Sequence, residues 1–249
     1  MTDRGWALVT GAGRRIGRAL ALAAARAGYD VIIHVRTRAS GEETARMARS
    51  YGRRVEILEA DLGDVDACRA LIGRAPAPPE LLVNCASVFD DDRLETTTPE
   101  LWNRTLATNL RAPVLLAQAF AAAAAPNMIG LIVNIIDQRV WRLDPSFFSY
   151  TISKAALWTA TQTMAQALAP RIRVNAIGPG PTLPNTYQSP DDFAAEAAAS
   201  PLGRAIAPEE IADALRYLID ARSVTGQMIA VDGGQHLAWR SSDAMADPR

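Results

Sequence analysis

The chain has 249 residues and little of what marks several classes of protein. Its two cysteines, Cys68 and Cys85, are too few for a disulfide framework, which predicts free thiols in a reducing compartment. The formal net charge of −1 provides no overall field to attract nucleic acid or an anionic membrane. No apolar run is long enough to span a bilayer, and no group of residues has metal-ligand spacing.

We expect no targeting segment before the fold, because MTDRGWALVTG enters an expected strand almost at once. The composition, 49% hydrophobic and 21% charged, is typical of a globular protein, and we expect it to be cytoplasmic. No linker, repeat or charge block divides the chain. We therefore expect a single domain over residues 1–249.

Short runs rich in Val and Ile alternate with longer Ala-rich segments. Runs that are apolar on both faces are typical of a buried parallel sheet. The alternation predicts an α/β protein with a doubly wound Rossmann fold, a parallel seven-stranded sheet with helices on both faces. The expected strands are 6–10, 31–35, 55–60, 81–86, 131–136, 172–177 and 227–232. The expected helices lie near 15–28, 41–51, 64–74, 99–125 (interrupted at Pro113), 149–169 and 208–220.

One irregular stretch, residues 178–207, separates the last two expected strands. Its prolines break regular structure, while DDFAAEAAAS favours a short helix begun by Asp191 or Asp192. Beside a cofactor site, such an insertion predicts a substrate lid. An ordinary surface loop is the alternative.

Directly after the first expected strand, TGAGRRIG (residues 10–17) opens a helix. Gly11 suits a tight turn, and Gly17 suits close packing of helix on sheet. The helix N-terminus then offers free N–H groups and a positive dipole end to a pyrophosphate. The context predicts a dinucleotide site, with Gly11, Arg14, Arg15, Ile16 and Gly17 in contact with the cofactor.

The end of the second expected strand discriminates between two cofactors. An NAD site usually has a carboxylate there for the ribose 2′-hydroxyl, whereas this chain has Arg36, Thr37 and Arg38. Guanidinium groups suit a 2′-phosphate, and Arg15 adds another cation within reach. The sequence therefore predicts NADP(H), although each arginine taken alone also fits a solvated surface charge. After the third expected strand, Asp61 and Leu62 are expected to flank the adenine, where a helix cap is the alternative for Asp61.

Tyr150 and Lys154 lie four positions apart, so a helix would place them on one face. A phenol has a reference pKa of about 10, and a neighbouring ammonium favours the phenolate. We therefore expect Lys154 to make Tyr150 a better proton donor. The alternative is structural, because a packed Tyr one helical turn from a solvated Lys has the same spacing.

Several motifs occur in one characteristic order and spacing over nearly the whole chain. They are TGAGRRIG, Asp61-Leu62, NCAS at 84–87, Asn109, the pair of Tyr150 and Lys154, GPGP at 178–181 and VDGG at 231–234. In these the chain resembles the short-chain dehydrogenase/reductase family. The resemblance implies further cofactor contacts from Asn84, Ala86, Ser87, Tyr150, Lys154, Pro179, Gly180 and His34. Since His34 alternates with apolar residues, it is also expected to be packed.

Two departures from the family pattern are informative: Arg15 replaces the middle glycine of the turn, and Asp137 replaces a serine. Both resemble the pteridine reductase and dihydromonapterin reductase branch, as do Arg36-Thr37 and the segment from Ala86 to Phe89. This resemblance implies hydride transfer from NADPH to the C=N bond of a pterin. Asp137, Tyr150, Lys154 and Asn109 would be catalytic, and Ser87, Phe89, Asp137 and Tyr150 would contact the substrate.

Each of these residues has an expected task. Lys154 would hold the nicotinamide ribose, Tyr150 would deliver the proton, and Asp137 would relay it from a strand end that keeps the carboxyl protonated. Asn109 would interrupt its helix and hold a water connected to Lys154, and Phe89 would stack on the pterin. Structural alternatives are a cap before a turn for Asp137, a plain helical residue for Asn109 and packing under the lid for Phe89.

Two other functions stay open: reduction of a ketone or 3-oxoacyl thioester, and a nonenzymatic NADP-binding sensor or scaffold. A sensor has no need of Tyr150, Lys154 and Asn109 together. The resemblance also implies a closed homo-oligomer, a homotetramer, built from the helices near 99–125 and 149–169 and a C-terminal contact.

Overall fold

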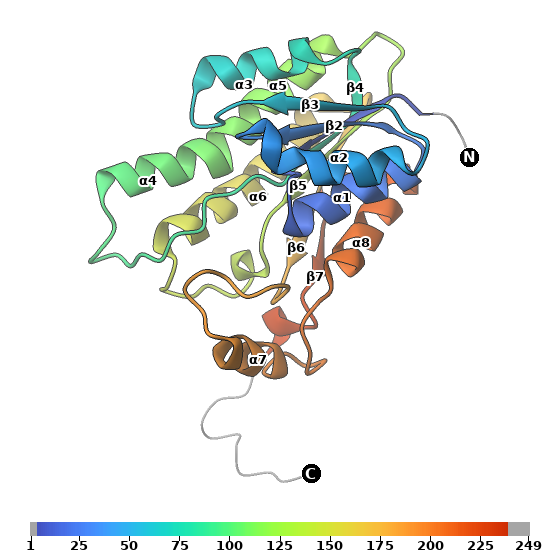
Figure 1. Cartoon of the computed structure of the whole chain (residues 1–249). Helices are drawn as coiled ribbons and strands as arrows, with labels where there is room; N and C mark the ends of the chain where they lie inside the picture. Colours follow the sequence, from blue (N-terminus) through green and yellow to red (C-terminus); the bar gives the residue numbers. More distant parts are fainter. Residues whose placement is uncertain (1–3, 239–249) are drawn as a thin grey trace, which may run out of the picture.

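A computed structural model describes residues 4–238, and these contain one seven-stranded parallel sheet (Figure 1). The strands lie in the order β3-β2-β1-β4-β5-β6-β7, which confirms the expected doubly wound Rossmann fold. The strand order reverses between β1 and β4, which is the topological switch point of the sheet. Ligands of such sheets bind there, beyond the carboxyl ends of the strands. The strands are β1 (Trp6–Thr10), β2 (Asp30–Val35), β3 (Val55–Glu59), β4 (Pro79–Asn84), β5 (Gly130–Ile135), β6 (Ile172–Pro179) and β7 (Met228–Val231).

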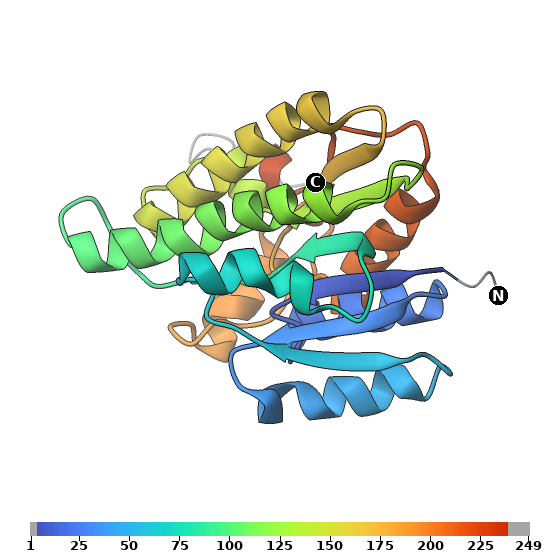
Figure 2. The same cartoon turned by 90° about the horizontal axis from the view of Figure 1, so that it is seen from above.

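Helices cover both faces of the sheet (Figures 1 and 2). One apolar cluster packs α1 (Arg15–Arg26), α2 (Glu42–Arg49) and α8 (Pro208–Asp220) against one face. A second packs α3 (Val65–Leu71), α5 (Ala112–Ala123) and α6 (Phe148–Leu168) against the other. Each fully buried Leu or Ile of the strands, such as Leu8 or Ile132, contributes about 1.5–3 kcal/mol relative to an exposed position. Across residues 4–238, no helix has the length and apolar character that crossing a bilayer requires.

The helical run near 99–125 is interrupted, but not at Pro113. It consists of α4 (Pro99–Leu106), a π-helical turn (Ala107–Arg111) and α5, and Pro113 lies in the first turn of α5. Pro113 has no N–H to donate to the carbonyl of Asn109 four residues earlier. The interruption therefore centres on Asn109, as the resemblance implied, and the expected break at Pro113 is a few residues too late.

The connection between β6 and α8, residues 180–207, contains the expected short helix, α7 (Pro190–Ala198). The cap is Ser189, whose hydroxyl accepts the N–H of Asp192 at 3.1 Å. The predicted start at Asp191 or Asp192 is therefore slightly late, and both acids lie in the first turn, where negative charge favours the helix dipole. Backbone bonds from Leu202 to Gly233 (3.0 Å) and from Ile206 to Pro181 (2.8 Å) fix the base of the connection.

Candidate active site

The glycine-rich turn between β1 and α1 has the close approaches that its sequence predicts. Gly11 has φ +66°, and a Cβ at Gly17 would lie 2.2 Å from the carbonyl oxygen of Gly11. Because α1 begins at Arg15, its first N–H groups have no partner inside the helix. The turn is thus a cradle of backbone donors that fits a pyrophosphate.

His34 holds this turn from inside the protein. Its Nδ1 accepts the N–H of Gly11 at 3.3 Å, and its Nε2 lies 3.1 Å from the carbonyl oxygen of Ala60. Burial lowers the pKa of His34 to about 4, so the ring is neutral and carries its hydrogen on Nε2. The expected packing is confirmed, since the residue is 2% exposed. The side chain of His34 is therefore in contact with Gly11 and not exposed at the crevice.

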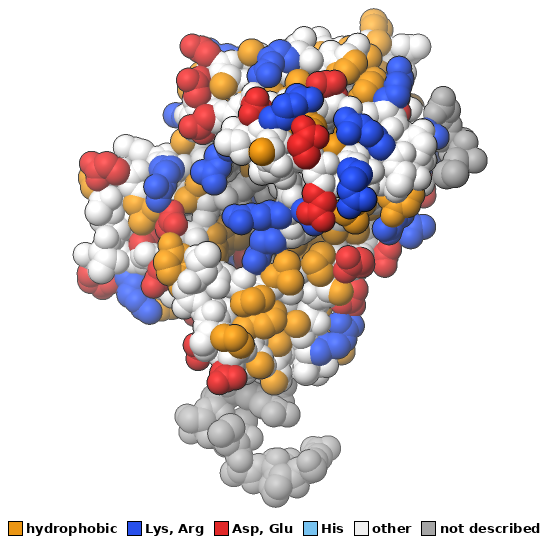
Figure 3. All heavy atoms as spheres, in the orientation of Figure 1, with side chains coloured by type: hydrophobic (Ala, Val, Ile, Leu, Met, Phe, Trp, Pro, Cys, Tyr) orange, Lys and Arg blue, Asp and Glu red, His pale blue; other side chains and the backbone are white. Residues whose placement is uncertain are grey.

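The arginines of the predicted adenosine end have different surroundings. The guanidinium of Arg36 is exposed and makes no hydrogen bond or ion pair with any residue from 4 to 238. The side chain of Arg38 already has two partners within the protein: it forms an ion pair with Glu42 at 3.4 Å and donates to the carbonyl of Ile57 at 3.2 Å. Thr37 is exposed beside Arg36. Figure 3 shows cationic side chains gathered beside a hollow where Figure 1 places one end of α1.

Arg15 points elsewhere. It has φ +52°, a left-handed conformation that favours glycine, and its guanidinium donates to the carbonyls of Pro184 (2.9 Å) and Leu183 (3.0 Å). The cation that was expected to join Arg36 at a 2′-phosphate is therefore bound to the β6–α8 connection in this structure.

The end of β4 lies against the glycine-rich turn. Thr10, which the sequence did not single out, accepts the N–H groups of Cys85 (2.9 Å) and Ala86 (3.1 Å) through its hydroxyl. Asn84 points away from the crevice, because it is buried and its amide donates to the side chain of Asn134 at 2.8 Å. Ser87 is exposed at the crevice.

Three further predicted contacts lie at other strand ends. Asp61 is exposed and accepts the N–H of Gly63 at 2.8 Å, whereas Leu62 is 5% exposed and packs in the core beneath α3. Leu62 therefore offers an adenine ring little side-chain surface. Gly180 lies close to Asp232, whose Cα would be 2.6 Å from a Cβ at that position, and Pro179 before it is buried at the end of β6.

Asp137, Tyr150 and Lys154 converge where β5 ends and α6 begins. The hydroxyl of Tyr150 donates to Oδ2 of Asp137 at 2.9 Å, and Nζ of Lys154 lies 5.5 Å from the centre of the Tyr150 ring. Lys154 donates to the carbonyl of Ile135 at 2.8 Å. Oδ1 of Asp137 accepts the N–H of Arg139 at 2.9 Å, so the carboxyl also caps the turn that follows it.

Burial controls the protonation of these three groups. It raises the pKa of Asp137 and lowers the pKa of Lys154 to about 8. Burial first, and then Asp137, raise the pKa of Tyr150 well above its usual 10.0. The expected lowering by Lys154 is wrong for this structure, because desolvation of the phenolate outweighs the attraction of an ammonium that is itself costly to bury.

Asn109 connects the π-helical turn to the crevice. Its Oδ1 accepts the N–H of Val88 at 2.8 Å and the hydroxyl of Ser87 at 3.2 Å. Its Nδ2 donates to the carbonyl of Val88 at 2.9 Å and to Ser153 at 3.1 Å. Asn109 thus joins the segment after β4 to α6 directly.

An aromatic stack lines the site beside Tyr150. The ring of Phe89 stacks on Phe147 at 4.2 Å and meets Tyr150 edge-on at 4.6 Å, and the guanidinium of Arg139 lies 5.2 Å from the centre of the Phe147 ring. Phe147 has φ +52°, which is strained for a bulky residue. Sequence reasoning found Phe89 but missed Phe147 and Arg139, for which the only signal was a position between Asp137 and Tyr150.

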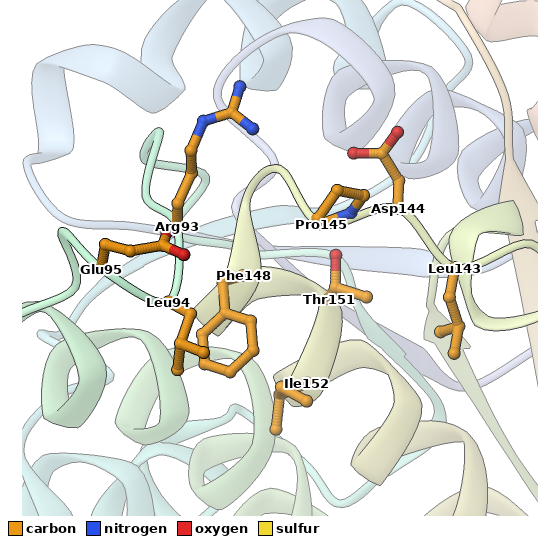
Figure 4. A pocket seen from close by; sticks show the side chains of 9 residues that line it. All are labelled: Arg93, Leu94, Glu95, Leu143, Asp144, Pro145, Phe148, Thr151 and Ile152. Carbon is orange, nitrogen blue, oxygen red and sulfur yellow. The ribbon is translucent and has the colours of Figure 1, made fainter.

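A separate pocket of about 510 Å³ lies on the outer side of the first turn of α6 (Figure 4). Thr151 lines it, but Asp137, Tyr150 and Lys154 do not. Leu94, Leu143 and Ile152 at its walls are exposed. The pocket is lined by Arg93, Leu94, Glu95, Leu143, Asp144, Pro145, Phe148, Thr151 and Ile152.

A doubly wound parallel sheet, a glycine-rich turn before α1 and a Tyr-Lys pair on α6 define a dinucleotide-dependent oxidoreductase. A family model described as Enoyl-(Acyl carrier protein) reductase matches residues 11–236. The chain belongs to the short-chain dehydrogenase/reductase family.

Solved structures and curated relatives resemble the chain over nearly its whole length. FolM Alternative dihydrofolate reductase 1 from Brucella canis, complexed with NADP, is 48% identical with a TM-score of 0.93, and the match covers 98% of each chain. FolM Alternative dihydrofolate reductase 1 from Brucella suis, also in complex with NADP, is 49% identical with a TM-score of 0.92, covering 98% of this chain and 99% of that one. L-xylulose reductase from Bos taurus is 35% identical over 239 residues, which are 92% of this chain and 95% of the relative.

Proposed function

We propose that the chain is an NADPH-dependent reductase of a C=N bond in a pterin or dihydropterin. The observation that carries this proposal is the hydrogen bond between Tyr150 and Asp137, where a carboxyl with a raised pKa occupies the place of a neutral hydroxyl. A reduced C=N bond gains a hydride at carbon and a proton at nitrogen. A carboxyl–phenol pair supplies that proton, whereas an ionised carboxylate would repel the oxyanion that forms when a ketone is reduced.

The cofactor is NADP(H). The crevice at the carboxyl ends of β1 and β4 fits a pyrophosphate, and the exposed side chains of Arg36 and Thr37 fit a 2′-phosphate. Both FolM structures contain NADP. When bound, NADPH supplies the hydride.

The chain's own groups bind the ribose and move the proton. Lys154 holds the nicotinamide ribose with its ammonium, and its bond to Ile135 fixes its direction. Tyr150 donates to the ring nitrogen. Its hydroxyl donates to Asp137 in the structure, and Asp137 in its protonated form would return a proton to the phenol along the same contact once that proton has been transferred. Asn109 positions α6 and the segment after β4 relative to one another.

Phe89 is the wall against which a flat heterocycle lies. Phe147 and Tyr150 hold its ring from one side and from the edge. Aromatic contacts of this kind add about 0.5–1.5 kcal/mol beyond burial, which suits a planar ring better than an extended acyl chain.

Reduction of a ketone or 3-oxoacyl thioester is the second candidate, and the identity with L-xylulose reductase favours it. Oxidation of NADPH with dihydrobiopterin, dihydromonapterin and an acetoacetyl thioester separates the two. Turnover of a pterin far above the thioester supports the proposal, and the reverse order rejects it. Tyr150→Phe abolishes turnover and leaves NADPH affinity nearly unchanged if the chain is an enzyme rather than a sensor.

The chain forms a homotetramer in a reducing, cytoplasmic compartment. Support for assembly comes from the exposed apolar side chains Leu94, Leu143 and Ile152 around the outer pocket. Both cysteines are free thiols, which supports the compartment. Light scattering tests the assembly: four chains per particle are expected, and a monomer contradicts it.

A further inference from the structure

The β6–α8 connection passes over the candidate site as a short irregular segment, residues 183–187, here called the strap. Two side-chain contacts hold the strap, and they come from opposite walls of the crevice. Arg15 is the first residue of α1, which follows β1, and Asp90 belongs to the segment after β4. Because β1 and β4 are neighbours in the sheet, the strap is tied across the switch point of the fold.

The first contact, or tie, is bidentate. The two terminal nitrogens of Arg15 donate to the consecutive carbonyls of Leu183 (3.0 Å) and Pro184 (2.9 Å). The planar guanidinium of arginine presents two donors that match these two carbonyls. The single ammonium group of lysine does not match them. Arg15 keeps this position in spite of a backbone conformation that favours glycine, with φ +52°.

The second tie is a carboxylate shared by two elements. Oδ1 of Asp90 accepts the hydroxyl of Tyr187 at 3.1 Å, while Oδ2 accepts Arg104 of α4 at 2.5 Å. Arg104 therefore fixes the direction of the carboxylate that receives the strap. Oδ1 of Asn185 accepts the N–H of Tyr187 at 2.7 Å and turns the backbone so that the phenol reaches Asp90.

We propose that Arg15 and Tyr187 are positioning residues that close the strap over bound substrate, and that Arg15 is a tie for the strap rather than a ligand of the cofactor phosphates. The inference rests on the proposed function only in taking the covered crevice as the substrate site. A closed strap keeps water from the reacting atoms and retains the substrate. Loss of a tie then raises KM and leaves the chemical step intact.

Hydrogen–deuterium exchange of residues 183–188 in the NADPH complex tests the ties without any substrate. Arg15→Gly relieves the strained backbone and so keeps the fold, and Tyr187→Phe removes one hydroxyl. Each is expected to speed exchange of the strap by about tenfold, since local opening reports the free energy of the lost contact. Tyr217→Phe on α8 is the matched control, because Tyr217 is exposed and its hydroxyl has no partner within residues 4–238.

Arg15→Lys distinguishes the tie from a phosphate contact. Lysine keeps the charge and loses the bidentate contact, so NADPH affinity stays within about threefold of the wild type while the strap still exchanges fast. The inference is overturned by a combined result. Arg15→Gly would lower NADPH affinity tenfold or more, Arg15→Lys would restore that affinity, and exchange of the strap would be unchanged in both variants.

Kinetics supply a second readout. Arg15→Gly and Tyr187→Phe are expected to raise the KM of the preferred substrate about three- to tenfold at constant kcat. An unchanged KM in both variants overturns the inference even where a pterin is reduced. If pterins are not reduced at all, the proposed function fails and the exchange measurement still decides the role of the strap.

Discussion

Tyr150 donates its hydroxyl hydrogen to Oδ2 of Asp137 at 2.9 Å, and this bond ties the start of α6 to the end of β5. The other oxygen of Asp137 accepts the N–H of Arg139. The structural and the catalytic interpretations of Asp137 are therefore compatible, because each uses a different oxygen. The bond from Arg139 to Oδ1 fixes the carboxyl, so that Oδ2 faces the phenol.

The activity of the enzyme should fall as pH rises. In the free protein, burial lowers the pKa of Lys154 to about 8, so the ammonium that binds the ribose is lost as pH rises through that value. Since kcat/KM reports groups of the free enzyme, it should decline through about pH 8. A value of kcat/KM that is flat or rising between about pH 7 and 9 contradicts a role for the Lys154 ammonium.

Folding stability should be lost in acid through His34. The folded pKa of about 4 lies below the ordinary 6.5, so the unfolded chain binds the extra proton first. The contribution is complete above about pH 6.5 and disappears as pH falls toward 4, with a maximum of about 3 kcal/mol.

Urea unfolding near pH 7 and near pH 4.5 measures this loss. His34→Gln removes the titration and keeps a donor for Ala60, so it should be less stable than the wild type at pH 7 and show a smaller loss in acid. An equal acid loss in both proteins would show that other groups cause it.

Phe147 offers a test of the aromatic stack. Phe147→Ala and Phe147→Gly both remove the ring that supports Phe89, and KM for a pterin should rise about two- to tenfold, as expected for one lost aromatic contact. The glycine variant should be more stable than the alanine variant by about 1 kcal/mol, because only glycine adopts φ +52° without strain. Equal stability of the two variants would argue against a strained Phe147.

Asp92 should matter for the stability of α6. Its carboxylate is buried and accepts the N–H of Ser149 at 3.1 Å, next to the catalytic tyrosine. Asp92→Ala should cost about 1–2 kcal/mol in urea unfolding. Asp91→Ala is the control, since Asp91 is exposed and its change should stay within about 0.5 kcal/mol. Similar values for the two variants would show that the carboxylate of Asp92 does not stabilise the start of α6.

The sequence predicted the sheet well because its seven apolar runs are short, separate and buried on both faces, and α8 has the expected limits. It predicted the convergence of Asp137 and Tyr150 because both lie near the junction of β5 and α6. It could not predict the turn of Arg15 toward Leu183, because that contact joins residues 168 positions apart and depends on an irregular segment.

Two other misses have physical reasons. The pKa of Tyr150 depends on burial, which no local pattern reports, and this reversed the direction expected from Lys154. The left-handed backbone of Phe147 has no sequence signal, since an aromatic residue rarely adopts it.

The most direct test of the account is Asp137→Ser assayed on two substrates, a dihydropterin and an acetoacetyl thioester, with Asp213→Asn on the exposed face of α8 as a control. We expect kcat for the dihydropterin to fall by about 10²–10⁴, as for loss of a general acid, while the thioester is reduced no more slowly than before. An Asp137→Ser enzyme that reduces the dihydropterin as fast as the wild type contradicts this expectation.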